Sequence, residues 1–334
     1  DMDSVLSCMV SDEIGQGRLS AELASAVSSY LGRAGGVALR EHSRAVELVF
    51  AEIDLQPGDA IGLSPFLNAV YLDVAEAMGL EVVVLDVDPA RSVVEAEATE
   101  AALAQNPAIK ALVVDTPLGR IPDLDRIVET GVVLVEDVSE GLGANTGEKK
   151  CGAYGSFTIV GLEKHHVITA GGGALALAAK RNAAASLKRR ADEKVGIRLA
   201  DMNASLGVTQ IKALETFVAR RAEIAAVFGQ AVAMGKHRTL IHDGDGENVF
   251  FGFPVIAETG LKEIIAYARR HGVEVAPAYE GTIAARLLED AEPDTPHARS
   301  NAANLVRRCA LFPLYPMMNK ETIETVRRVL GSLP

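Results

Sequence analysis

Cysteine is scarce in this sequence, with three residues in 334, and no two of them form a CxxC pair. Cys8, Cys151 and Cys309 lie far apart and are odd in number, which excludes a disulfide framework and a metal site built on thiolates. Tryptophan is absent, and aromatic residues make up only 4% of the chain. We therefore expect three reduced thiols and a core made mainly of aliphatic side chains.

Long apolar runs are also absent. No stretch approaches the roughly 20 uninterrupted apolar residues of a membrane helix. The first residues, DMDSVLSCMVSDEIGQG, lack the basic-then-apolar order of a signal peptide. These absences predict a cytoplasmic protein that has no membrane partner.

Basic residues are fewer than acidic ones, since the chain has 33 Lys and Arg and 45 Asp and Glu. The net charge of −12 repels a phosphate backbone, which excludes nucleic acid as a partner. Hydrophobic residues, in contrast, make up 49% of the chain and exclude a disordered protein. Since single cores rarely grow past roughly 250 residues, the length predicts two lobes.

The first lobe has short apolar segments separated by segments of helical period. Near-continuous apolar runs indicate strands that are buried on both faces, hence a mostly parallel sheet between helices. Expected strands occupy residues 82–87, 111–114, 132–138, 157–162 and 174–178, and expected helices occupy residues 19–31, 69–78 and 95–105. The fold class is therefore α/β, with a mostly parallel sheet sandwiched by helices.

From residue 183 to about 229 the pattern is helical, and a turn-rich HDGDGEN follows at 242–248. Beyond it we expect strands at 249–256 and 273–278, a helix at 261–270 and a last helix after Asn319. This order predicts a large α/β domain at 1–235 and a small α+β domain at 236–334.

Three glycines after the expected strand at 132–138 have the spacing GxGxxxG, at Gly141, Gly143 and Gly147. A dinucleotide loop has GxGxxG and an acidic residue that ends a following strand about 20 positions on, and neither is present. We interpret these glycines as an ordinary turn.

Three features could carry chemistry together: Asp137 at the end of an apolar strand, the cluster Lys164-His165-His166, and the glycines at 171–173. A carboxylate at the carboxyl end of a parallel strand lies where open α/β sheets bind ligands, and it can hold a cationic ring nitrogen. An amine or imidazole before a glycine run fits a loop that approaches a cofactor closely. Alternatively, the two histidines are ordinary polar loop residues. No metal site is predicted, because adjacent histidines do not easily face one ion and no third ligand is near.

Several strings, taken in order, resemble a known family. The central ones are VLVEDVSEGLGA (133–144), KKCGAYGSF (149–157) and HHVITAGGGAL (165–175). Others are PGD (57–59), LDVDP (85–89), GRIPDLD (119–125), MNASLGVTQIKALETFVARRAEIA (202–225) and LFPLYPMMNKETIETVRRVL (311–330). They resemble the sugar aminotransferases of the DegT/StrS family, which are fold-type-I pyridoxal-phosphate enzymes, and the resemblance covers most of the chain.

The resemblance gives Asp137 the role of the acid that pairs with the pyridine nitrogen of the cofactor. The family's Schiff-base lysine falls on His165 without a gap, and a slip of one residue places it on His166 or Lys164. A subset of the family, the sugar dehydratases, is similar in having His in place of this lysine. An imidazole can move protons while pyridoxamine phosphate stays noncovalently bound.

The remaining positions that the resemblance assigns to cofactor binding are Ser43, His42, Glu140 and Arg198. Some of the family's positions are changed here. The phosphate-binding Ser-Gly-Thr is replaced by Glu41-His42-Ser43, in which Glu41 would repel a dianion.

Three further positions differ from the family. The stacking aromatic residue falls on Asn68, with Phe66 and Tyr71 nearby; the serine before the lysine falls on Val160; and the asparagine contributed by the other subunit falls on Gly196.

Two hypotheses follow from these comparisons of residues. The first is an enzyme that uses pyridoxal or pyridoxamine phosphate on a nucleotide-linked keto-sugar, of transaminase or dehydratase type. The second is a noncatalytic member of the family, without the cofactor, that serves in binding or assembly. The family builds its active site across a two-fold interface, so the resemblance implies a homodimer, with Met202, Leu206 and Val208 adding apolar area to the interface.

Overall fold

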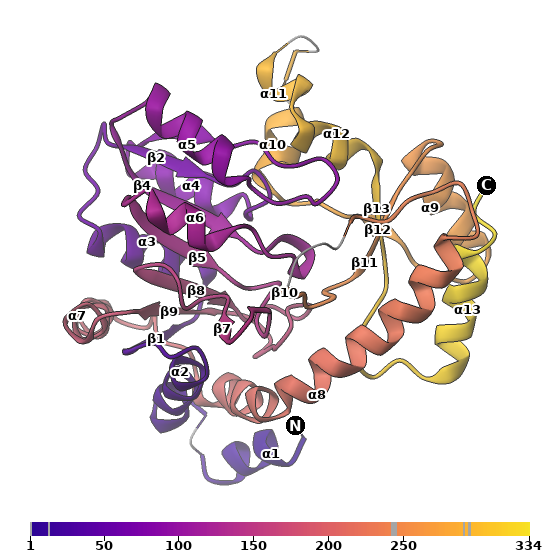
Figure 1. The fold of residues 1–334 in the computed structure, drawn as a ribbon. Coiled ribbons are helices and arrows are strands. Elements are labelled where there is room, and N and C mark those ends of the chain that lie inside the picture. The colour runs from indigo at the N-terminus through magenta and orange to yellow at the C-terminus, as the bar shows by residue number, and fades with distance from the viewer. Residues whose placement is uncertain (1, 13, 242–245, 290, 293–294) are drawn as a thin grey trace.

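The computed structural model describes residues 2–12, 14–241, 246–289, 291–292 and 295–334. Its largest element is a seven-stranded sheet of order β1-β9-β8-β5-β4-β2-β3 (Figure 1). The strands are β1 (Gly35–Leu39), β2 (Ala60–Leu63), β3 (Glu81–Val84), β4 (Ile109–Asp115), β5 (Val133–Asp137), β8 (Phe157–Gly161) and β9 (Ala174–Ala178). Neighbours from β3 to β8 run parallel, whereas β9 runs antiparallel to β8 and β1.

The mostly parallel sheet predicted from the sequence is confirmed. Every residue of β2, β8 and β9 is buried, as near-continuous apolar runs indicate for strands covered on both faces. The sequence pattern missed β1 and β2, because both are short and contain glycine, which is depleted in strands.

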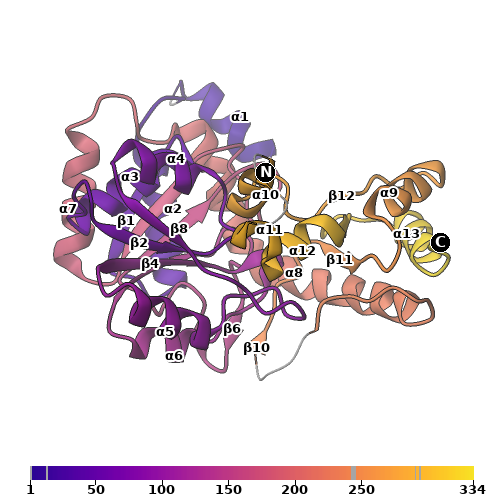
Figure 2. The same cartoon turned by 90° about the horizontal axis from the view of Figure 1, so that it is seen from above.

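Helices cover both faces of the sheet. One face packs against α2 (Arg18–Tyr30), α5 (Ala96–Gln105), α6 (Leu124–Glu129) and α8 (Asp201–Val232). The other packs against α3 (His42–Glu52), α4 (Val70–Ala77) and α7 (Arg181–Asp192). In Figure 2, α3 and α4 lie above strands β2 and β4, and α5 and α6 lie below them. The single helical stretch expected from residue 183 to 229 is two helices, because Gly196 between them takes a left-handed φ of 77°.

A second, smaller sheet has the order β11-β13-β12 and is antiparallel. Its strands are β11 (Phe253–Ile256), β12 (Ala276–Pro277) and β13 (Cys309–Phe312). Together with α9 (Leu261–Arg270), α13 (Lys320–Leu330) and the last turns of α8, it forms a core of its own. In Figure 1, α8 runs from beneath the large sheet to this second core.

The two strands expected beyond residue 248 are shorter than predicted. β11 starts at Phe253 because the carbonyl groups of Phe250 and Phe251 accept hydrogen bonds from Arg221 rather than from a strand. β12 is reduced to two residues, one of which is Pro277, a residue that cannot donate to a ladder. The predicted turn at 242–248 lies partly outside the described residues.

The other described elements are α1 (Met2–Val10), β6 (Asn145–Thr146), β7 (Lys149–Lys150), β10 (Gly246–Glu247), α10 (Ile283–Glu289), α11 (Pro296–Arg299), α12 (Asn301–Arg308) and the 3₁₀ turn η1 (Pro117–Gly119). Although they follow residue 235, α10 and α12 pack against the core of the large sheet. The division into domains at residue 235 therefore remains our proposal. The three cysteines are free and buried. Among the described helices, none is long and apolar enough to cross a membrane.

Candidate active site

The carboxyl ends of the parallel strands border a cavity of about 780 Å³. Asp115 ends β4, Asp137 ends β5, and both line this cavity. The first turn of α3, the glycines at 171–173 and residues 280–282 complete its wall. Open α/β sheets bind their ligands at this edge. The cavity is therefore the candidate active site.

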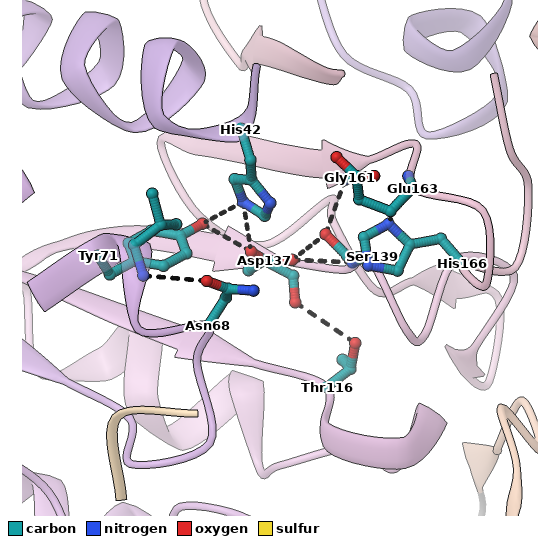
Figure 3. A network of polar contacts seen from close by, with 10 residues as sticks. His42, Asn68, Tyr71, Thr116, Asp137, Ser139, Gly161, Glu163 and His166 are labelled. Atoms are coloured by element: carbon teal, nitrogen blue, oxygen red, sulfur yellow. Dashed lines mark hydrogen bonds and ion pairs between the residues drawn. The ribbon is translucent and has the colours of Figure 1, made fainter. Parts of the chain in front are cut away.

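Asp137 is at the centre of a polar network in this cavity (Figure 3). Its Oδ1 accepts hydrogen bonds from the backbone N–H of Ser139 at 2.9 Å and from the hydroxyl of Ser139 at 2.5 Å. Its Oδ2 lies 2.6 Å from the hydroxyl of Tyr71 and 3.2 Å from Nε2 of His42. Burial by itself would raise the pKa of Asp137, but the contacts with these three residues lower it to about 2. Asp137 is thus a buried, ionised carboxylate.

His42 and Tyr71 reach Asp137 from two different helices. His42 is the first residue of α3, and Tyr71 belongs to α4 and is fully buried. Burial and the charge of Asp137 raise the pKa of Tyr71 well above its ordinary value, so its hydroxyl keeps its proton and donates it. The two rings meet edge to face at 5.5 Å. The sequence assigned His42 to the phosphate end of the cofactor, whereas the structure turns its ring towards Asp137.

Two further acidic side chains line the cavity beside Asp137. Asp115 accepts a 2.5 Å hydrogen bond from the Ser64 hydroxyl, and burial raises its pKa to about 7. Glu140 accepts a 2.6 Å hydrogen bond from the backbone N–H of Leu118, and burial together with the nearby charges of Asp115 and Asp137 raises its pKa to about 8. Three neighbouring carboxyl groups therefore hold their protons to different extents at neutral pH.

We predict that Glu140→Gln changes how stability depends on pH. A raised carboxyl pKa adds stability below the ordinary value of 4.5, and this contribution is lost as the pH rises through about 8. The variant cannot ionise, so it should match the parent within about 1 kcal/mol at pH 5 and exceed it by several kcal/mol at pH 9, at about 1.4 kcal/mol for each unit of the raised pKa. Urea unfolding at the two pH values measures the difference. Parallel stability curves for parent and variant would contradict the assignment.

Of the three residues 164–166, two line the cavity and one lies outside it. His165 and His166 line the cavity, whereas Lys164 is exposed and does not belong to the wall. Nδ1 of His166 accepts a hydrogen bond of 3.1 Å from the backbone N–H of Glu163, and burial lowers the pKa of His166 to about 4. His166 is therefore neutral and carries its proton on Nε2. His165 packs edge to face on His166, with 5.3 Å between ring centroids.

The glycine run is required by the backbone. Gly171, Gly172 and Gly173 all have positive φ, of 74°, 139° and 94°. A Cβ on Gly173 would also lie 2.4 Å from the carbonyl oxygen of Leu39. A side chain at these positions would strain the loop that carries the two histidines.

The part of the cavity that the resemblance assigns to phosphate is the first turn of α3. Glu41 is the N-cap and makes no side-chain cap, and the Ser43 hydroxyl lies 3.4 Å from the Glu41 carboxylate. Arg40 is a cation on this wall that the sequence analysis did not single out. Its side chain donates to the carbonyl oxygen of Arg198, but Arg198 itself pairs with Asp192 and lies outside the cavity wall of this chain. The assignment of Arg198 to the cofactor stays a prediction.

The aromatic side chains near the cavity have other partners. Phe66 lines the cavity and stacks on Tyr279 with ring centroids 3.9 Å apart. Asn68, the position of the family's stacking residue, also lines the cavity, and its side chain accepts from the backbone N–H of Val70. Sequence reasoning also missed Asp115, although it ends a buried strand in the same way as Asp137, which is the signal that could have revealed it.

A family model confirms the resemblance. Residues 1–331 match the model of the DegT/DnrJ/EryC1/StrS aminotransferase family. The chain belongs to this family. Its sequence is 23% identical to GDP-perosamine synthase of Caulobacter vibrioides, over 84% of this chain and 81% of that relative. It is 22% identical to the dTDP-4-dehydro-2,3,6-trideoxy-D-glucose 4-aminotransferase of Saccharopolyspora spinosa, over 98% of this chain and 92% of that relative.

Solved structures share the fold. The S. venezuelae DesV structure, in complex with a ketimine intermediate, has a TM-score of 0.89 at 17% identity and covers 99% of this chain and 93% of its own. A mutant of GDP-4-keto-6-deoxymannose-3-dehydratase with bound GDP-perosamine has a TM-score of 0.86 at 19% identity, over 98% of this chain and 96% of its own. These relatives are enzymes, and the comparisons give no support to the noncatalytic alternative.

Members of the DegT/DnrJ/EryC1/StrS family use pyridoxal phosphate, whose ring nitrogen and phosphate need different partners. The ring end fits the residues present, because Asp137 is buried, ionised and already bound to an aromatic N–H group, the imidazole of His42. The phosphate end has fewer favourable partners, because Arg40 and the Ser43 hydroxyl lie beside the carboxylate of Glu41. The site therefore suits the ring of the cofactor better than its phosphate.

Proposed function

We propose that this protein is an enzyme acting on a nucleotide-linked keto-sugar, with a noncovalently held pyridoxal or pyridoxamine phosphate, and that it is of the dehydratase type. One observation carries the choice of type: His165 and His166 line the cavity with Asp137, whereas Lys164 lies outside it. Covalent attachment of the cofactor needs an amine in the cavity, and imidazole cannot replace it in that role.

Asp137 holds the ring nitrogen of the cofactor in this proposal, and Ser139 holds Asp137 in place. When bound, the cofactor supplies a ring that withdraws electrons from the bonds of an attached substrate. His165 takes up a proton at one of its own imidazole nitrogens and returns it, as a general base and then a general acid. His166 stays neutral and fixes the loop through its bond to the backbone of Glu163.

The substrate class is proposed from the relatives and from the cavity. Of the two relatives found by sequence, one is a GDP-perosamine synthase and the other is a 4-aminotransferase of a dTDP-linked sugar. Asp115 and Glu140 are protonated to a large extent at neutral pH, so both can donate hydrogen bonds to the oxygens of a sugar as well as accept them.

The test is whether the cofactor becomes attached to the chain. We expect that borohydride reduction of a mixture with pyridoxal phosphate leaves the peptide containing Lys164 unmodified in mass analysis. His165→Lys is the positive control, because it places an amine in the cavity and should acquire a pyridoxyl mass. A pyridoxyl group on Lys164 of the parent would instead establish ordinary aminotransferase chemistry.

We also propose a homodimer, located in the cytoplasm. Met202 is exposed and Leu206 is half-buried at the start of α8, and the exposed Leu6 and Val10 of the adjacent α1 add apolar surface. Val208, which the sequence analysis added to this surface, is buried in the core of its own chain and is not available to a partner.

Light scattering should give twice the 35.2 kDa of one chain. The combined Leu6→Asp and Met202→Asp variant should shift the mass towards one chain, because charges replace exposed apolar area. A parent protein that is monomeric at micromolar concentration would contradict the homodimer.

A further inference from the structure

The carboxylate of Asp137 has no acceptor site left for a cofactor. An ionised carboxylate offers about four lone-pair positions. Ser139 uses two of them at Oδ1, through its backbone and its hydroxyl, and Tyr71 and His42 use the two at Oδ2. A cofactor ring can bind Asp137 only if one of these donors leaves.

His42 is the donor that can leave. Ser139 is two residues from Asp137, and its hydroxyl also accepts a hydrogen bond from the backbone N–H of Gly161 at 2.7 Å, so it is fixed on both sides. Tyr71 is fully buried in the core. The His42 contact is the longest of the four at 3.2 Å, and His42 lies on the cavity wall with 11% of its side chain exposed.

His42 also resembles the group it would give way to. Its imidazole is a planar aromatic ring that presents an N–H to a carboxylate, as a protonated pyridine does. Its backbone lies in the first turn of α3, at the position that the resemblance assigns to phosphate binding. One side chain thus extends from the phosphate end of the site to the ring-nitrogen end.

We propose that His42 is an internal ligand of Asp137 that competes with the cofactor for this carboxylate. The inference rests on the proposed function, since it assumes that the cavity takes pyridoxal or pyridoxamine phosphate. It makes cofactor binding an exchange: the His42 side chain rotates away from Asp137, and the ring nitrogen takes its place at Oδ2. The chain therefore keeps Asp137 paired when no cofactor is bound, at a cost in cofactor affinity.

Equilibrium dialysis and fluorescence titration with pyridoxamine phosphate test this competition. His42→Ala should bind the cofactor at least tenfold more tightly than the parent, and His42→Gln, which can still reach Asp137, should show a smaller gain. His271→Ala is the matched control and should leave the affinity for the cofactor unchanged. His271 is an exposed histidine that follows the last residue of α9 and packs on Tyr267. Thermal unfolding confirms that each variant is folded.

The increase in cofactor affinity caused by His42→Ala must also depend on Asp137. In an Asp137→Asn background, His42→Ala should bring no gain, because the contested carboxylate is gone. A gain that persists there would mean that the substitution only enlarges the cavity, and it would overturn the inference. Equal or weaker binding by His42→Ala, with measurable binding by the parent, would overturn the inference and leave the proposed function standing. Binding by neither protein at millimolar cofactor would overturn both.

A spectroscopic measurement on the parent does not depend on any His42 variant folding. In protein labelled with ¹⁵N-histidine, the ring resonances of His42 should shift when pyridoxamine phosphate is added. Without the cofactor, they should also differ between the parent and Asp137→Asn. The chain has only seven histidines, so assignment is practicable. Unchanged His42 resonances in the presence of bound cofactor would show that the two do not compete.

Discussion

Asp137→Asn is expected to lower the affinity for pyridoxamine phosphate by about 100-fold or more, and turnover with it. The carboxylate, with its pKa lowered to about 2, is ionised at neutral pH, whereas an amide carries no charge and presents N–H groups towards the cofactor's own N–H. Charge-assisted hydrogen bonds contribute about 1.5–3 kcal/mol each, and losing one or two of them accounts for this factor. Dialysis and fluorescence titration measure the change.

Asp115→Asn is the matched control for this experiment. Asp115 ends the neighbouring strand, lines the same cavity and has the same shape, but its pKa of about 7 leaves much of it uncharged at neutral pH. Replacing it should change cofactor affinity by less than tenfold. If Asp137→Asn and the parent gave overlapping titrations, Asp137 would be only a polar residue that stabilises the end of its strand.

His165→Ala is expected to reduce turnover of a nucleotide-linked keto-sugar by 100-fold or more, while cofactor affinity stays within about threefold of the parent. A positioned general acid or base contributes roughly 10²–10⁴-fold to a rate. His165 is the exposed member of the histidine pair on the cavity wall, whereas His166 is held by the backbone and is neutral. Steady-state kinetics combined with dialysis separates the two effects.

Lys164→Ala serves as the control, since the lysine is exposed and lies outside the cavity wall. It should retain turnover within about threefold. The reverse result, in which Lys164→Ala is inactive and His165→Ala is active, would assign proton transfer to the lysine and contradict the dehydratase type.

The cavity as a whole is more acidic than a site for a phosphorylated cofactor requires. Glu41, Glu163 and Glu280 line it in addition to the three acids at its floor. Their charges oppose a dianionic phosphate, and the His42 contact opposes the ring nitrogen. If the cavity takes the cofactor as proposed, we therefore expect weak, reversible binding at both ends of the site.

Several features of this protein could be predicted from the sequence because each depends on local patterns. Continuous apolar runs indicate strands buried on both faces, and β9 (Ala174–Ala178) was predicted at its observed bounds. The end of such a run marks the edge at which open α/β sheets bind ligands, which is why Asp137 was predicted as a site residue. The order of short strings along the chain was sufficient to identify the family.

Which side chains meet in the candidate site was decided by the tertiary structure. Tyr71 and Asp137 are 66 positions apart, and His42 is farther still, so no local pattern indicates that all three meet. The raised pKa values of Asp115 and Glu140 arise from burial and from neighbouring charges, which exist only once the strands are packed side by side. Likewise, periodicity cannot say which of Lys164, His165 and His166 faces the cavity, because the loop is irregular and its three glycines set its direction. The sequence by itself determined five of the seven strands of the large sheet and the edge at which the apolar runs end, since both follow from which residues avoid water. The strands β1 and β2 and the pairing of His42 with Asp137 were decided only by the tertiary structure, which brings distant parts of the chain together.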